Sequence, residues 1–255
     1  MKIVVCYKSV PNSDSISVNR DLSIDLSSAE WEIGQYDLRA IEAGMKLAAQ
    51  SEDSTVCALT VGGNIVGNSK LKKAVLSRGP AEMYGVQDPS LAGADSLTSA
   101  EVLAAAIAKL GQVDLVLCGE GSGDAYAQQV GNMLGGTLGW TTVNGVSAVS
   151  PCDGGLRLER TLGDGVEVLE LSLPAVISVT GDINTPRIPT MKDILGAGKK
   201  PAVIWPLESL SVGLCPASET ISVLAPEQSE RKKLIFDASQ DGAVSEFAAQ
   251  LAKAL

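Results

Sequence analysis

The first 145 residues alternate between strand-like and helix-like patterns of apolar positions. Short continuous apolar runs are typical of strands buried on both faces, and they occur at Lys2–Tyr7, Thr55–Val61, Glu82–Val86 and Asp114–Cys118. Apolar residues at helical spacing lie between these runs and predict helices over Tyr36–Ala49, Ile65–Ser77, Ser96–Leu110 and Ala127–Leu138. Strands that alternate with helices in this way predict an α/β fold with a doubly wound, mostly parallel sheet.

Two segments of alternating apolar and polar residues interrupt this order. Ser15–Leu26 has the pattern of a hairpin on the surface. Residues 156–173 alternate on both sides of Gly163-Asp164-Gly165, which predicts a β-hairpin with a glycine-containing turn. Pro174–Val179 then returns to the pattern of a buried strand. We therefore expect a β-hairpin inserted into the α/β domain.

The last part of the chain is less regular. Gly181–Lys200 is polar and interrupted by prolines, and it predicts a loop with a short helix near Met191–Leu195. Irregular chain is expected from Pro201 to about Lys233, and Gly242–Leu255 has the pattern of a terminal amphipathic helix. A compact domain does not need such an arm for itself. We therefore predict an α/β domain over residues 1–200 and a C-terminal arm over residues 201–255 that packs on a partner subunit.

Composition and charge narrow the functional classes. Hydrophobic residues make up 45% of the chain, but no apolar run approaches the ~20 residues that span a bilayer. The N-terminus enters a strand directly, without the apolar segment of a signal peptide. We therefore expect a cytoplasmic protein without membrane insertion. The net charge of −10 argues against nucleic-acid binding, because phosphate contacts need clustered cations.

The chain contains no histidine, which removes several kinds of active site. A Ser-His-Asp triad, a Cys-His pair and a His-ligated metal all need this residue. The cysteines are scattered without a CxxC pair, which suits neither a disulfide framework nor a zinc site, and Cys6, Cys57 and Cys118 are expected to be buried, reduced thiols. We predict a binder or carrier with no catalytic residue of its own and no metal site.

The most informative motif is a glycine-rich stretch after the predicted strand that ends at Cys118. It reads Gly119-Glu120-Gly121-Ser122-Gly123-Asp124 and leads into a predicted helix from about Ala127. Glycines let the backbone approach a ligand closely, and a helix N-terminus favours an anion. Asp124 and Gln128 are placed to hydrogen-bond a ribose or phosphate, although a plain flexible turn also explains the glycines. The stretch is no P-loop, because no Lys-Ser or Lys-Thr pair follows, and no Rossmann fingerprint, because the strand before it comes late in the chain.

Other predicted strand ends are expected to meet beside this stretch, since the carboxyl ends of parallel strands share one edge of a sheet. They carry Cys6-Tyr7-Lys8 and Thr60-Val61-Gly62-Gly63. Lys8 is a candidate cation for phosphates, although a solvated lysine explains it equally well. Gly34-Gln35-Tyr36-Asp37 begins the first helix and is a candidate to close over an adenine. For Asp37 the alternative is an acid favoured by the helix dipole.

Residues 182–195 form a candidate interaction surface. Pro186 and Pro189 stiffen this segment, and we expect Arg187, Ile188 and Met191 to project from it. An exposed methionine is adaptable and suits a surface that meets more than one partner. The alternative is that Ile188 and Met191 pack on the domain.

Several stretches of the chain together form a signature. They are the hairpin residues Leu158-Glu159-Arg160 and Leu173-Pro174-Ala175-Val176, the motif Asp182-x-Asn184-x-Pro186-Arg187-x-Pro189, the pair Lys199-Lys200 before Pro201, the loop Ala127–Gly131 and the helix end Leu71–Gly79. From Met1 to about Pro201 the chain thereby resembles the β subunits of electron transfer flavoproteins. It is most similar to a bacterial branch associated with nitrogen fixation and carnitine metabolism.

The resemblance implies an electron carrier whose partner α subunit holds most of the FAD. It implies that this chain binds AMP in a nucleotide-binding domain, or a second FAD as in electron-bifurcating relatives. Electrons then pass between dehydrogenases and an acceptor such as a quinone oxidoreductase. The implied recognition loop comprises Asn184, Pro186, Arg187, Ile188, Met191, in place of an anchoring leucine, and Leu195. The residues expected to bind the cofactor, from strand ends and resemblance together, are Cys6, Lys8, Gly34, Gln35, Tyr36, Asp37, Val61, Gly62, Cys118, Gly119, Gly121, Ser122, Asp124, Ala127, Gln128, Gln129 and Val130.

Two departures from the family bear on the bound nucleotide. Gly34-Gln35 replaces the usual Asn-Pro before the first helix, and the loop keeps Asp124 but lacks the acidic cluster common elsewhere. AMP, a second FAD and an empty pocket therefore stay open. Outside the family, a stand-alone adenine-nucleotide-binding regulator of universal-stress-protein type fits the fold but needs neither the hairpin nor the loop. An ATP-pyrophosphatase-type enzyme is disfavoured, because no Ser-Gly-Gly-x-Asp-Ser loop follows the first strand.

Overall fold

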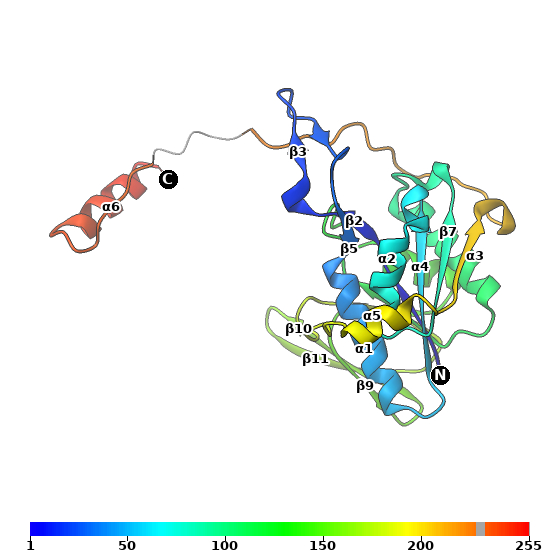
Figure 1. Ribbon diagram of the computed structural model, residues 1–255. Coiled ribbons are helices and arrows are strands. Elements are labelled where there is room, and N and C mark those ends of the chain that lie inside the picture. Colours follow the sequence, from blue (N-terminus) through cyan, green and yellow to red (C-terminus); the bar gives the residue numbers. More distant parts are fainter. Residues whose placement is uncertain (228–232, 255) are drawn as a thin grey trace.

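The computed structural model of the chain describes residues 1–227 and 233–254. Its centre is a nine-stranded sheet with the order β11-β10-β9-β12-β8-β1-β6-β7-β13 (Figure 1). The neighbouring strands from β9 to β13 in this order run parallel. They are β9 (Thr141–Cys152), β12 (Ala175–Val179), β8 (Leu115–Gly119), β1 (Lys2–Cys6), β6 (Thr55–Gly62), β7 (Glu82–Gln87) and β13 (Ala202–Pro206). The predicted α/β fold with a mostly parallel sheet is confirmed.

The inserted hairpin forms one edge of this sheet. β10 (Gly155–Leu162) and β11 (Gly165–Leu171) pair antiparallel, and β10 also pairs antiparallel with β9. The predicted hairpin over residues 156–173 is therefore confirmed. Smaller sheets join β2 (Ser9–Pro11) to β5 (Trp31–Ile33) and β3 (Ser17–Val18) to β4 (Ile24–Asp25). The second of these is the hairpin expected within Ser15–Leu26.

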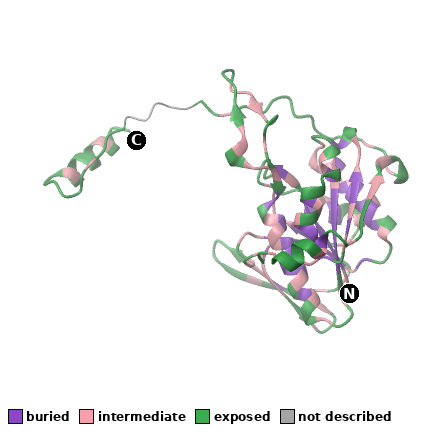
Figure 2. Cartoon of the chain, in the orientation of Figure 1, coloured by how far each residue is buried: buried purple, intermediate pink, exposed green. Residues whose placement is uncertain are grey.

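Helices cover both faces of the sheet (Figure 1). Residues of α1 (Gln35–Gln50), α2 (Ser69–Leu76) and α5 (Met191–Ala197) pack into one apolar core. The other core takes residues of α3 (Ser96–Leu110) and α4 (Val130–Leu138). Successive residues of β1 point to opposite faces, so Val5 belongs to the first core and Val4 to the second. The buried residues accordingly gather along the central strands in Figure 2.

The predicted helix Ile65–Ser77 is wrong in its first turn. A 3₁₀ turn, η2 (Asn64–Gly67), precedes α2, and Asn68 separates the two. The Asn68 side chain accepts hydrogen bonds from the backbone N–H groups of Lys70 and Leu71, so it caps α2 at its N-terminus. Asparagine is favoured at such caps, which explains why the helix begins after it. The remaining 3₁₀ turns are η1 (Ser13–Ser15), η3 (Pro89–Leu91) and η4 (Leu207–Ser209).

The chain after Pro201 is more ordered than its sequence indicated. β13 and η4 lie within the stretch expected to be irregular, so that expectation is wrong there. Further along, Asp95 Oδ2 accepts hydrogen bonds from the backbone N–H groups of Ala217 and Ser218, at 2.8 and 3.0 Å. Leu224 forms an isolated antiparallel bridge with Ser23. These contacts attach the first half of the arm to the α/β domain.

The predicted terminal helix is present as α6 (Ala243–Ala252). None of its described residues is buried, and it lies apart from the sheet in Figures 1 and 2. Among the helices that the structure describes, none combines the length and hydropathy that a bilayer-spanning segment requires.

Candidate nucleotide site and interaction surface

The strand order places a topological switch point between β1 and β8. From β1 the chain adds β6 and β7 on one side, and then β8 and β12 on the other. Doubly wound sheets bind ligands outside the carboxyl ends of the strands at such a reversal. Since β1 lies between β6 and β8, the predicted meeting of these three strand ends is confirmed.

Asp37, in the first turn of α1, joins the two strand ends at the switch point. Its carboxylate accepts hydrogen bonds from the backbone N–H of Lys8, at 2.7 Å, and of Gly119, at 3.3 Å. Burial raises the pKa of Asp37 to about 7, and these N–H groups oppose the rise because they favour the charged form. Whatever it binds, Asp37 therefore fixes the end of β1 against the end of β8, which is a role the sequence did not indicate.

The glycines of the loop allow its backbone to approach α1. A Cβ on Gly119 would lie 2.7 Å from both Asp37 Oδ1 and Tyr36 Cβ, and one on Gly121 would lie 2.5 Å from the Tyr126 ring. A side chain at Gly119 would collide with the backbone of α1, and one at Gly121 would displace the Tyr126 ring. The Tyr36 and Tyr126 rings pack together with their centroids 5.4 Å apart. Gly119 and Gly121 are thus required by close packing, while Gly123 has open space around it.

Lys8 reaches from the end of β1 to the glycine-rich loop. Its Nζ lies 2.7 Å from Asp124 Oδ2 and 2.8 Å from Asp124 Oδ1. Burial disfavours the Asp124 carboxylate, but hydrogen bonds from Lys8 and Ser122 outweigh this effect and lower its pKa. Because both side chains are partly exposed, this pair leaves Lys8 within reach of an incoming anion.

Helix α4 begins at Val130, so the predicted start near Ala127 is wrong. Tyr126 and Gln128 have left-handed backbone angles, with φ of 45° and 57°, which a right-handed helix excludes. Gln129 is the N-cap residue, and among the described residues no side chain caps it. The first N–H groups of α4 are therefore available to an anion, as a phosphate site requires.

The predicted cofactor-binding residues fall into three groups. Those at the switch point are Cys6, Lys8, Gly34, Gln35, Tyr36, Asp37, Cys118, Gly119, Gly121, Ser122, Asp124 and Val130. Val61 and Gly62 lie one strand further, at the end of β6. Ala127, Gln128 and Gln129 are exposed in the stretch before α4. The arrangement offers backbone donors, a lysine and close-packed tyrosines, which suits binding more than proton transfer.

The predicted reduced thiols are confirmed. Cys6, Cys57 and Cys118 are free and buried. A hydrogen bond with Cys118 and burial both raise the pKa of Cys6 well above its usual value. Such a thiol is a poor nucleophile, because the thiolate is the reactive form. Within the described residues, no cluster of three or more His, Cys, Asp or Glu side chains is placed to hold a metal ion.

A comparison with protein-family models assigns the chain to a family. The model of the electron transfer flavoprotein domain matches residues 21–210, which is 190 of the 255 residues. The chain belongs to the electron transfer flavoprotein family. The match covers most of the switch-point site and all of the segment 182–195. Proteins of this family are electron carriers that bind FAD and work with partner proteins.

In this family member, hydrogen bonds from α1 hold the segment 182–195 in place. Arg187 donates from Nε and Nη2 to the carboxylate of Glu42, at 2.6 and 3.2 Å. Asn184 Nδ2 donates to the backbone carbonyl of Arg39, and the Arg39 guanidinium donates to the backbone carbonyl of Asn184. Arg39 and Glu42 are not among the residues predicted from the sequence. The available signal was a carboxylate at position 42, next to Ile41 on the buried side of the predicted helix.

The exposed side of the same segment is apolar. Ile188 is 91% exposed, Met191 72% and Leu195 70%, so the alternative in which Ile188 and Met191 pack on the domain is wrong. Arg187 is also exposed, with 42% of its side chain accessible, while its guanidinium pairs with the buried carboxylate of Glu42. Thr190 and Asp193 form a capping box at the start of α5, the helix that carries Met191 and Leu195. The hydrogen bonds to α1 and the capping box of α5 therefore fix the backbone that carries the exposed side chains of Ile188, Met191 and Leu195.

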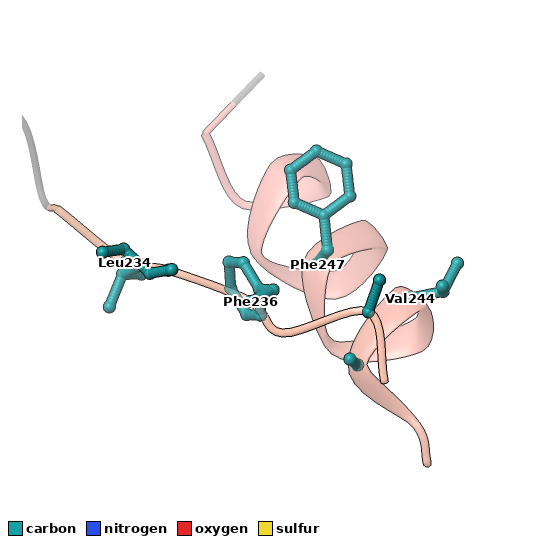
Figure 3. Close-up of a pocket in the computed structure, with 7 residues that line it drawn as sticks. Leu234, Phe236, Val244 and Phe247 are labelled. Atoms are coloured by element: carbon teal, nitrogen blue, oxygen red, sulfur yellow. The ribbon is translucent and has the colours of Figure 1, made fainter. Parts of the chain in front are cut away.

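A second apolar region lies in the arm. Leu234, Phe236, Val244 and Phe247 line a hollow between an extended stretch and α6 (Figure 3). Phe236 and Phe247 meet edge to face, with ring centroids 5.7 Å apart. Val244 is 73% exposed and Phe247 50% exposed. This hollow is far from the switch point in sequence and is lined by apolar groups, so it has the character of a packing surface and not of the nucleotide site.

Proposed function

We propose that the chain is the β-type subunit of a heterodimeric electron transfer flavoprotein. The observation that carries this proposal is the family match over a doubly wound domain, whose switch point gathers a lysine, a glycine-rich loop and an uncapped helix N-terminus. The FAD is held mainly by the α subunit and supplies the electron-transfer chemistry when bound. This chain contributes no acid, base or nucleophile to that chemistry. Its part is to bind, to orient and to dock.

The switch-point site suits AMP. Its phosphate would lie on the uncapped N-terminus of α4 with Lys8 nearby, and its adenosine would lie against the backbone of Gly119–Gly121. The Tyr36 and Tyr126 rings, tilted by 42° to each other, supply an aromatic surface beside it. A second FAD shares the adenosine and phosphate groups that these features recognise. The chemistry of the donor set therefore fits an adenine nucleotide, held as a structural group.

The exposed apolar segment and the arm suit partner binding. Ile188, Met191 and Leu195 form the recognition loop surface, to which dehydrogenases and a quinone-oxidoreductase-type acceptor dock in turn. Of the predicted arm, residues 201–255, the part after β13 packs on the α subunit, which thereby covers the apolar side chains around α6. We place the protein in the cytoplasm and in the bacterial branch that its sequence resembles.

Calorimetric titration with AMP, and separately with FAD, tests the nucleotide site. We expect saturable binding, and we expect Lys8→Met to weaken it on the order of tenfold through loss of a cation beside the phosphate. The control is Lys70→Met, which removes an exposed lysine on α2 that pairs with Glu30. Equal affinities for the two variants would remove Lys8 from the site, and no binding of either nucleotide would contradict it.

A further inference from the structure

The segment that leads into the recognition loop runs along the first turns of α1 with a constant offset. Arg39 contacts Asn184 and Glu42 contacts Arg187, and each pair is separated by 145 positions. Tyr36 and Gly181 have the same separation, and a Cβ on Gly181 would lie 3.4 Å from Tyr36 Cε1. Contacts at every third residue of both segments fix their register.

The strongest link in this register is the ion pair of Glu42 and Arg187. The Glu42 side chain is only 8% exposed, and its carboxylate also accepts a hydrogen bond from the backbone N–H of Arg187 at 3.3 Å. A buried carboxylate without a partner is strongly unfavourable, so opening the segment leaves Glu42 uncompensated. The hydrogen bonds between Arg39 and Asn184 add a second attachment one turn earlier.

The same face of α1 ends at the nucleotide site. The Tyr36 ring packs on Tyr126 of the glycine-rich stretch, and Tyr36 also closes the space beside Gly119. One helix face therefore touches the switch-point site at Tyr36 and the recognition loop at Glu42. The two sites share α1 as a common wall.

We propose that Tyr36, Arg39 and Glu42 form a clamp that positions the recognition loop and couples its order to nucleotide binding at the switch point. The clamp rests on the proposed function, because it assigns the loop to partner docking and the switch point to a nucleotide. A ligand that packs on Tyr36 and Tyr126 favours the closed clamp, since it binds the state in which α1 is held in place. Arg39 and Glu42 are thus positioning residues, and they touch neither electron donor nor acceptor.

Limited trypsin digestion of the full chain tests the clamp directly. Trypsin needs the arginine side chain in its specificity pocket, and Glu42 holds the guanidinium of Arg187 in the closed state. We expect Glu42→Gln to speed cleavage between Arg187 and Ile188 by about tenfold or more, because a charge-assisted bidentate contact is lost. The matched control is Glu52→Gln, an exposed carboxylate just beyond α1, with cleavage at the wild-type rate. Equal rates for the two variants overturn the clamp.

A second variant guards against loss of the fold. Asn184→Ala removes the hydrogen bond to the Arg39 carbonyl without leaving a buried charge unpaired. We expect it to speed the same cleavage less than Glu42→Gln does, with the denaturation midpoint of the chain close to that of the wild type. Cleavage at the wild-type rate in this variant, together with an unfolded Glu42→Gln variant, overturns the clamp.

Saturating AMP tests the coupling, with FAD as the probe if AMP does not bind. We expect the nucleotide to slow cleavage after Arg187 in the wild type and to have little effect in Glu42→Gln, where the link to α1 is broken. A purely structural role of Glu42 predicts the same slowing in both proteins, and that result overturns the coupling. Failure of both nucleotides to bind removes the coupling together with the proposed site, whereas the digestion without nucleotide still decides the clamp.

Discussion

At the residue scale, Asp37 shows how one buried carboxylate builds the switch point. It is only 7% exposed and lies between the ends of β1 and β8. Its carboxylate accepts hydrogen bonds from two backbone N–H groups, one at each strand end. An acid in this position titrates near neutrality, because burial raises its pKa to about 7. Its ionisation is therefore linked to the stability of the folded chain.

We expect the stability contribution of Asp37 to fall as pH rises. The folded chain holds a proton on this carboxyl up to about pH 7, while the unfolded chain releases it near pH 4, so the contribution is largest below pH 4 and is lost on passing pH 7. Between these limits Asp37→Asn should gain stability relative to the wild type by about 1.4 kcal/mol per pH unit. Urea unfolding of both proteins from about pH 5.5 to 8.5 measures the difference. Parallel stability curves would contradict the assignment.

Glu42 illustrates a contact that the sequence alone does not reveal. Its partner Arg187 lies 145 positions away, and no local pattern connects them. The same holds for Asp37, whose contacts with Lys8 and Gly119 depend on which strands become neighbours. Local signals identified the loop and the strand ends as candidate sites, but only the strand order brought these side chains together.

At the element scale, two glycines of α4 distinguish the effect of tertiary packing from that of helix propensity. A Cβ on Gly131 would clash with Ser178 Oγ on β12, whereas Gly136 on the same helix is exposed with nothing within 4 Å. We expect Gly131→Ala to destabilise the fold by about 1–3 kcal/mol through overpacking. Gly136→Ala should be neutral or stabilising by up to about 1 kcal/mol, because alanine favours helix. Denaturant unfolding of the pair checks the contrast, and equal effects would contradict the packing of α4 on β12.

The end of α2 depends on a lysine from the segment after α5. Lys200 Nζ donates to the backbone carbonyls of Leu76, Gly79 and Pro80, at 2.8, 3.1 and 2.7 Å. We expect Lys200→Met to lower the free energy of unfolding by about 1–3 kcal/mol, because it leaves these carbonyls without their charged donor. Its neighbour Lys199 is exposed, so Lys199→Met serves as the control with little change. A loss of similar size in both variants would show that general charge, and not this contact, is responsible.

Most elements were predictable from periodicity, and the exceptions have physical causes. β13 follows Pro201 and ends with Pro206, and prolines argue against a central strand, but this strand is at the edge of the sheet, where they are tolerated. β9 carries many polar residues and is held by pairing with β10 and β12, which the sequence does not display. The start of α4 was misplaced because Tyr126 and Gln128 adopt left-handed angles without being glycines.

At the scale of the whole molecule, the α/β domain and the arm differ in how they bury apolar surface. The domain has one core on each face of its sheet. In the arm, Ile221 and Ile235 are 95% and 92% exposed, and α6 buries none of its described residues. An isolated chain with this much exposed apolar surface is expected to associate, because large apolar patches mark interaction sites. The proposed heterodimer satisfies this requirement.

Co-expression with a flavin-binding α subunit of the family tests the central claim most directly. The complex is separated by size-exclusion chromatography with absorbance at flavin wavelengths, and the nucleotides released on denaturation are identified. We predict a yellow heterodimer that releases FAD together with AMP, or two FAD if the β site holds a flavin. A colourless homodimer that releases only ATP would contradict the electron carrier and favour a stand-alone regulatory binder.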